Sequence, residues 1–142
     1  NSAGVQTLID WNSLNIDVGN LGDLTNDRAN IRRAGYYETS GGAGYGAITD
    51  QKYTNIQVWL NTTSGTKISN ASNRQSAASP SSIVGTSLSS KQVLCAAGDN
   101  ISMYFVTEEA NIGILNTDYS GGGSGILAGT TFFAVKEVLP NA

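Results

Sequence analysis

The sequence predicts an all-β protein, either a sandwich or a barrel, from three observations. Hydrophobic residues make up 39% of the 142 residues, while charged residues make up 13%, which is about half the usual charged share. Clusters of Gly and Ser interrupt nearly every window that is long enough for a helix. Short segments of alternating apolar and polar residues recur between turn residues. A chain of this length is expected to fold as one domain, residues 1–142.

The alternation is clearest in three segments. Their apolar rows contain Ile56, Val58 and Leu60 in residues 55–61, Ile101, Met103 and Phe105 in residues 100–106, and Phe133 and Val135 in residues 130–139. Further strands are expected near residues 7–11, 33–39, 68–71, 89–97 and 112–118. Successive side chains on a strand point to opposite faces. Trp59, Tyr104 and Phe132 therefore lie on the faces opposite these apolar rows.

A Gly-Asp pair stands between two apolar runs in "VLCAAGDNISMYFVT", residues 93–107. Gly98 is expected to adopt a backbone conformation that other residues avoid, and Asp99 is expected to hydrogen-bond the turn. The pair is predicted to form a corner between two core strands, the second of which begins at Asn100.

Three segments between the strands are predicted to be loops. Residues 40–46 and 120–125 are glycine-rich, and residues 72–82 are polar. A phosphate-binding loop would need Lys-Ser/Thr after its glycines and then a helix, and neither follows here.

The residue types argue against catalysis. The chain has no His and a single Cys, Cys95, so no imidazole can activate a nucleophile and no internal disulfide can form. Cys95 lies in an apolar run, where a buried, inert thiol is expected. The adjacent pair Glu108 and Glu109 is expected to lie exposed in a turn. We therefore expect a protein that is not an enzyme and that needs no cofactor.

The stretch at residues 17–27 has two interpretations. Its oxygen-bearing side chains are those of Asp17, Asn20, Asp23, Asn26 and Asp27. Calcium takes six to eight oxygen ligands, and such a loop supplies several. Turns rich in Asp and Asn without a metal are the commoner outcome and are favoured here. Zinc lacks its usual ligands.

The negative charge of the chain argues against nucleic acid and anionic membranes as partners. The formal net charge is -3, which disfavours nucleic acid and anionic membranes. The basic doublet Arg32-Arg33 is expected to lie on the solvated surface. The chain begins at Asn1 and not at Met, so we expect it to be a processed or excised piece of a longer protein.

Four stretches, in order along the chain, resemble the tumour necrosis factor and complement one-q globular-head superfamily. These are "TLIDWNSLNIDVGN" at the start, "IRRAGYYET", "AAGDNISMYF" around the Gly-Asp corner, and the closing aromatic strand "GTTFFAVKEVL". The resemblance implies a jelly-roll β-sandwich of about ten short antiparallel strands. It further implies a tight homotrimer that acts as a recognition head and not as an enzyme.

The resemblance and the nearly uncharged polar surface favour an attachment head of a bacteriophage or viral structural protein, located on the virion surface. This head would be a fibre tip, a receptor-binding head or a capsid decoration. The expected partners are a host cell-surface receptor, either glycan or protein, or capsid subunits. The alternative is a head domain on a bacterial cell or spore surface that binds protein or glycan.

Two sets of functional residues follow from this reading. Aromatic residues away from the apolar rows are expected to contact neighbouring subunits, and these are Tyr36, Trp59, Tyr104 and Phe132. A two-sided core that buries them within one subunit is the other explanation. The predicted loops are expected to bind the ligand through Tyr45, Arg74 and Tyr119, because Tyr beside Ser and Gly combines contact area with adaptable hydrogen bonding.

Overall fold

The computed structural model describes residues 3–11, 17, 19–45, 52–74, 84–108, 114–115 and 131–140. Within these residues the chain forms strands and no helix, so none of them lies in a helix that could cross a membrane. The strands are β1 (Thr7–Leu8), β2 (Gly22–Asp23), β3 (Arg28–Asn30), β4 (Gly35–Tyr45), β5 (Tyr53–Leu60), β6 (Thr66–Arg74), β7 (Val84–Cys95), β8 (Asn100–Thr107), β9 (Ile114–Leu115) and β10 (Phe132–Pro140).

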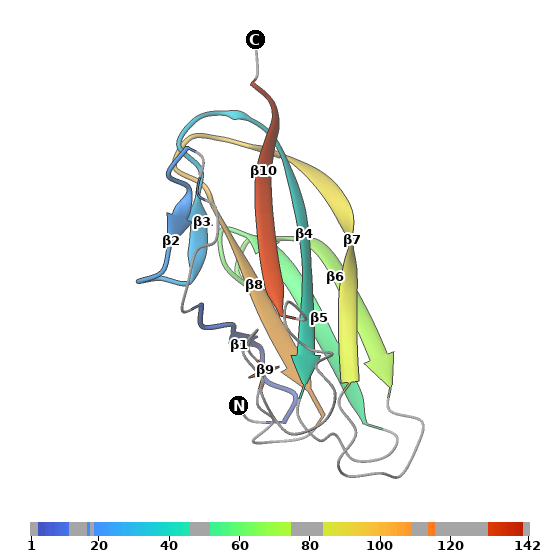
Figure 1. Cartoon of the computed structure of the whole chain (residues 1–142). Helices are drawn as coiled ribbons and strands as arrows, with labels where there is room; N and C mark the ends of the chain where they lie inside the picture. Colours follow the sequence, from blue (N-terminus) through green and yellow to red (C-terminus); the bar gives the residue numbers. More distant parts are fainter. Residues whose placement is uncertain are drawn as a thin grey trace.

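These strands form two antiparallel sheets (Figure 1). Sheet A has the order β2-β3-β8-β5-β6, and β1 also pairs with β8. Sheet B has the order β10-β4-β7, and β9 pairs with β4. The front layer in Figure 1 is sheet B, and the long strands of sheet A lie behind it. The neighbours of β8 and of β4 are distant in sequence, and the result is the predicted jelly-roll sandwich.

The apolar rows predicted from the sequence form the core between the two sheets. Ile56, Val58, Ile101, Met103 and Phe105 are buried on the inner face of sheet A. From sheet B they meet Tyr37, Ala43, Leu88 and Cys95, with Phe133 and Val135 half-buried against the cluster. The inward orientation of Phe133 and Val135 is as predicted.

The corner at Gly98-Asp99 also has the predicted form. Gly98 has a φ of 94°, in the region that favours glycine. The Asp99 carboxylate accepts a hydrogen bond from the backbone N–H of Ala96 at 2.8 Å, and β8 begins at Asn100.

The prediction of a glycine-rich loop at residues 40–46 is wrong, because β4 continues through Tyr45. Gly42 and Gly41 pair with Phe132 and Phe133 of β10. A Cβ on Gly41 would lie 2.7 Å from Met103 Sδ and 3.1 Å from the Phe132 carbonyl oxygen. The glycine is needed here for close packing between the sheets and not for a turn.

The core changes character at the lower end of Figure 1. Among the described residues, the core there contains the buried residues Thr54, Thr86, Thr107 and Thr131. The hydroxyl oxygens of Thr54 and Thr86 lie 3.3 Å apart, and the Thr131 hydroxyl accepts the backbone N–H of Gly44 at 3.0 Å. We call these four residues the threonine layer.

Candidate functional site

The four residues predicted to contact other subunits fall into two groups on opposite sides of the sandwich. Tyr36 on β4 and Phe132 on β10 point outward from sheet B. Trp59 on β5 and Tyr104 on β8 point outward from sheet A, since Val58 and Met103 beside them are buried in the core. One continuous patch cannot contain all four residues.

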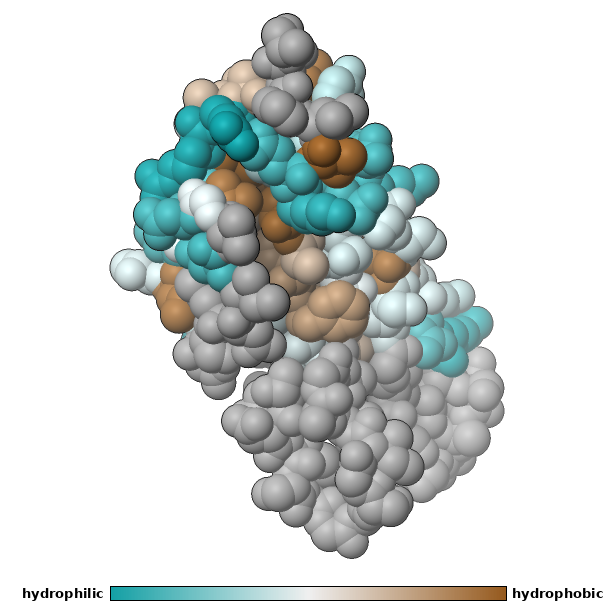
Figure 2. All heavy atoms as spheres, turned by 45° about the horizontal axis from the view of Figure 1, so that its top comes forward, coloured by the Kyte–Doolittle hydropathy of each residue, from teal (hydrophilic) through white to brown (hydrophobic). Residues whose placement is uncertain are grey.

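The outer face of sheet B is apolar at two places. Tyr36 is 45% exposed and Leu94, its partner in the register with β7, is 54% exposed. Phe132, toward the other end of the face, is 44% exposed. Figure 2 shows hydrophobic surface broken up by polar surface. Leu94 was not singled out from the sequence, because residues 93–97 are a continuous apolar run that does not show which side chains face outward.

The outer face of sheet A combines aromatic rings with side-chain amides. The Trp59 indole N–H donates to Gln57 Oε1 at 2.9 Å, and Gln6 Nε2 donates to the same oxygen at 2.6 Å. Gln57 Nε2 in turn donates to Asn55 Oδ1 at 2.7 Å. These bonds fix the orientation of the Trp59 ring and of both amides along β5.

Two cations from β6 lie over aromatic rings of β5 on this same face. Lys67 Nζ is 5.1 Å from the centroid of the Trp59 ring, and the Arg74 guanidinium is 4.8 Å from the Tyr53 ring. Both distances are within the range of a cation–π contact. Tyr104 pairs with Gln57 in the register of β8 and β5. Burial of the Tyr104 side chain raises the pKa of its phenol.

The structure alters the predicted set of ligand-binding loop residues. Arg74 ends β6 and stacks on Tyr53, so it belongs to the outer face of sheet A. Tyr45 ends β4, where its backbone pairs with Val84 and Ile114. The placement of these two residues in loops is therefore wrong, because both strands extend further than the alternation indicated. Tyr119 lies outside the described residues.

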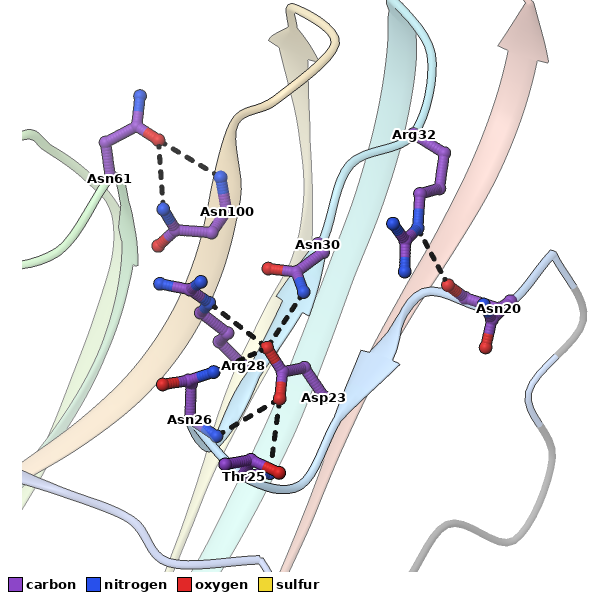
Figure 3. Close-up of polar contacts among 9 residues, drawn as sticks. All are labelled: Asn20, Asp23, Thr25, Asn26, Arg28, Asn30, Arg32, Asn61 and Asn100. Atoms are coloured by element: carbon purple, nitrogen blue, oxygen red, sulfur yellow. Dashed lines mark hydrogen bonds and ion pairs between the residues drawn. The ribbon is translucent and has the colours of Figure 1, made fainter.

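Asp23, at the centre of the predicted calcium stretch, is saturated by donors from the protein (Figure 3). Its Oδ2 accepts from the amides of Asn26 and Asn30, each at 2.9 Å, and lies 3.6 Å from Arg28 Nε. Its Oδ1 accepts the backbone N–H groups of Thr25 and Asn26. These bonds lower the pKa of the carboxyl, the side-chain bonds from Asn26 and Asn30 contributing most.

The neighbouring aspartates also cap backbone groups. Asp17 Oδ1 accepts from the backbone of Leu21 at 2.7 Å, and Asp27 Oδ1 accepts from the backbone of Trp11 at 2.9 Å. Across the described part of the chain, no group of three or more His, Cys, Asp or Glu residues could hold a metal ion. The aspartates of this stretch therefore serve as acceptors for backbone and amide N–H groups.

The basic doublet makes contacts within the chain. Arg33 forms a two-pronged ion pair with Glu137 of β10, with Nη2 2.7 Å from Oε2 and Nε 2.8 Å from Oε1. The Arg32 Nε donates to the carbonyl oxygen of Asn20 at 3.1 Å (Figure 3). Arg33 therefore ties the segment before β4 to β10.

Cys95 is buried, and this burial raises the pKa of its thiol to about 11. A thiol with such a pKa is almost entirely protonated at neutral pH and is a poor nucleophile. This agrees with the inert thiol expected from the sequence.

The chain has the fold of a tumour necrosis factor-like jelly roll. Among 55 solved chains that match its structure is one described as the structure of Eiger TNF from S. frugiperda. The TM-score is 0.54 and the sequence identity is 8%, with 81% of this chain and 66% of that chain covered. The chain thus spans just under two thirds of the length of that chain. No protein-family model and no curated protein matches the sequence.

Proposed function

We propose that the chain is a non-enzymatic attachment head of a bacteriophage or viral particle, assembled as a homotrimer. The observation that carries the proposal is the outer face of sheet B, where Tyr36, Leu94 and Phe132 are each close to half exposed. Large apolar side chains in this position lose their contact with water when a second copy covers them. This burial favours assembly by about 25 cal/mol for each Å² of apolar surface buried.

The composition of the chain supports a role in contact and not in chemistry. Cores of protein interfaces are depleted in charged residues, and charged residues make up 13% of this chain. The sequence contains no His, and Cys95 is buried and protonated. The single Cys also distinguishes the chain from secreted domains that depend on disulfides. We propose a virion as the setting, and a bacterial cell or spore surface is the alternative.

Assembly can be tested with a matched pair of surface variants. Light scattering of the native chain at micromolar concentration should give three times the mass of one subunit. Leu94→Ser on sheet B should give monomers, whereas Tyr53→Ser, which removes an exposed apolar residue from sheet A, should leave the trimer intact. A monomeric native chain would contradict the proposed assembly, and the reverse behaviour of the variants would move the contact to sheet A.

Attachment can be tested separately with particles that lack the protein. Labelled native trimer should be retained on such capsids or on host cells, and the Leu94→Ser monomer should be retained much less, because three linked sites bind with greater avidity. Retention on bacterial or spore surfaces without any retention on particles or host cells would favour the other setting.

A further inference from the structure

We propose that the outer face of sheet A is a binding platform for an acidic glycan, that is, a polymer of sugars that carry carboxylates. The platform consists of Tyr53, Asn55, Gln57 and Trp59 on β5 and Lys67 and Arg74 on β6. This inference deepens the recognition role proposed above and rests on it. It assigns the ligand to a sheet face in place of the loops.

The platform offers a chemical partner for each part of a sugar. A pyranose ring has an apolar face of C–H groups, a rim of hydroxyls and, in an acidic sugar, a carboxylate. Tyr53 is 42% exposed and Trp59 is half-buried, so part of each side chain is accessible beside the cation that lies over its ring, and such rings combine an apolar face with a polar edge. The amide of half-buried Asn55 offers a donor and an acceptor type to hydroxyls, while buried Gln57 orients Asn55 and Trp59.

The platform is ordered before any ligand arrives. Gln57 accepts from the Trp59 indole and donates to Asn55, and Asn55 Nδ2 donates to Ser72 Oγ of β6 at 2.7 Å. A ligand therefore does not have to immobilise these side chains. Avoiding that loss of conformational entropy strengthens binding.

The charge of this face differs from that of the whole chain. The formal net charge is -3, yet β5, β6 and β8 contain no Asp or Glu and contain the two cations Lys67 and Arg74. The acidic residues that follow β7 and β8 are engaged locally: Asp99 accepts from the Ala96 backbone, and Glu108 Oε2 accepts from the Tyr53 backbone at 3.0 Å. Lys67 and Arg74 are the groups of this face with which a carboxylated ligand would pair.

The two cation–aromatic pairs are spaced for a chain-like ligand. Tyr53 and Trp59 are six residues apart on one strand, a separation of about 20 Å at ~3.3 Å per residue. Lys67 pairs with Trp59 and Arg74 with Tyr53 in the register of β5 and β6. A single monosaccharide cannot reach both pairs, whereas an oligosaccharide lying along the strands can.

Nucleic acid shares negative charge and stacking rings with this ligand but fits the face less well. A protein that binds a nucleic-acid backbone commonly contacts about six to ten phosphates with its Lys and Arg side chains. The platform has two cations, and its amides match hydroxyl groups. Single-stranded DNA is therefore the comparison probe in the test.

The test measures binding of polygalacturonate and polysialic acid to the native chain by calorimetry and by quenching of tryptophan fluorescence. At least one of these polymers should bind, more tightly than neutral dextran or single-stranded oligo-dT. Trp59→Phe should abolish the quenching while the protein stays folded. Lys67→Gln should weaken binding by about tenfold, because a charge-assisted contact with the ligand carboxylate is lost, and should reduce its dependence on salt.

Lys136→Gln is the matched control, because Lys136 is an exposed cation on sheet B and its removal changes the net charge equally. This variant should bind like the native chain. No binding of either carboxylated polymer, equal binding of dextran or oligo-dT, or equal effects of the two lysine changes would each overturn the proposal.

The mass of each sample is measured alongside binding, so that the two proposals fail separately. A trimer that binds no carboxylated polymer refutes the platform and leaves the assembly standing. A monomer that binds the polymers, with the expected effect of Lys67→Gln, refutes the assembly and leaves the platform standing.

Discussion

The side-chain amide of Asn61 donates to the carboxylate of Asp99 at 2.9 Å and so joins two turns that are 38 residues apart in sequence. Asn61 Oδ1 also accepts the backbone N–H of Asn100 at 3.0 Å, as Figure 3 shows from the side of β8. Asn61 has a φ of 59°, and the next residue, Thr62, has a φ of 64°. The hydrogen bonds of Asn61 thus stabilise a left-handed backbone conformation at residues 61 and 62, which Asn tolerates and Thr does not.

Two changes in this turn should shift stability in opposite directions. Thr62→Gly should raise the free energy of unfolding by about 0.5–1 kcal/mol, because relief of left-handed strain exceeds the entropic cost of glycine. Gly65→Ala should lower it, because an added Cβ would overlap the carbonyl oxygen of Leu60. Urea unfolding measures both, and destabilisation by Thr62→Gly would show that the turn is not strained.

The adjacent residues Phe132 and Phe133 should have separable roles. Phe133 packs against the core, with its ring 6.0 Å from that of Trp11, so Phe133→Ala should cost about 3 kcal/mol of subunit stability. Phe132→Ala should leave the stability of the subunit nearly unchanged and weaken assembly. Thermal unfolding and light scattering of both variants distinguish these effects, and identical behaviour would contradict the assignment of the two faces.

The bonds to Asp23 predict how stability changes in acid. The pKa of this carboxyl is lowered in the folded chain, first by the side-chain bonds from Asn26 and Asn30, whereas the unfolded value is about 3.9. The resulting stabilisation is complete above the unfolded pKa and is lost as the pH falls through the lower folded pKa.

Asp23→Asn should therefore be less stable than the native chain at pH 7, and the difference should shrink as the pH falls below about 4. Urea unfolding across this range measures the difference. Asp10→Asn, at an exposed position, is the control for loss of one negative charge. A difference that stays constant with pH would show that the Asp23 bonds do not depend on its ionisation.

Cys95 should resist thiol reagents in the folded protein. Its pKa of about 11 reflects burial first and the nearby Asp99 carboxylate second, so little thiolate exists at pH 8. Labelling of the native chain should be slow and limited by opening of the fold, and labelling in denaturant should be immediate. Stoichiometric labelling of the native chain within seconds would contradict the buried environment.

Alternation in the sequence was enough to predict the core rows on β5, β8 and β10, because burial of one face requires that pattern. It could not locate β2 and β3, which contain two and three residues and of which β3 pairs with distant β8. It also failed at residues 40–45, where glycines that usually mark a loop instead allow the sheets to pack closely at Met103.

For the candidate sites, the sequence predicted which way single side chains point within a strand but not which strands pair. The sequence indicated that Trp59, Tyr104 and Phe132 point away from the core, but alternation within one strand does not say which sheet the strand joins. The platform was missed because Lys67 and Arg74 meet their rings only through the pairing of β5 with β6. A shift of one residue in that register would place both cations on the other side of the sheet.

The threonine layer makes the sandwich unequal along its length. Burial of a threonine, with one methyl and one hydroxyl, stabilises the fold less than burial of the aliphatic and aromatic side chains at the opposite end. The hydroxyls can also form equivalent hydrogen bonds with water when the fold opens. Opening fluctuations should therefore begin at Thr54, Thr86, Thr107 and Thr131 and spread toward Ile101. Backbone amides at the ends of β4 and β8 should exchange with deuterium sooner than those near Cys95. The two sheets should thus separate first at the end that holds the threonine layer and stay together longest at the other.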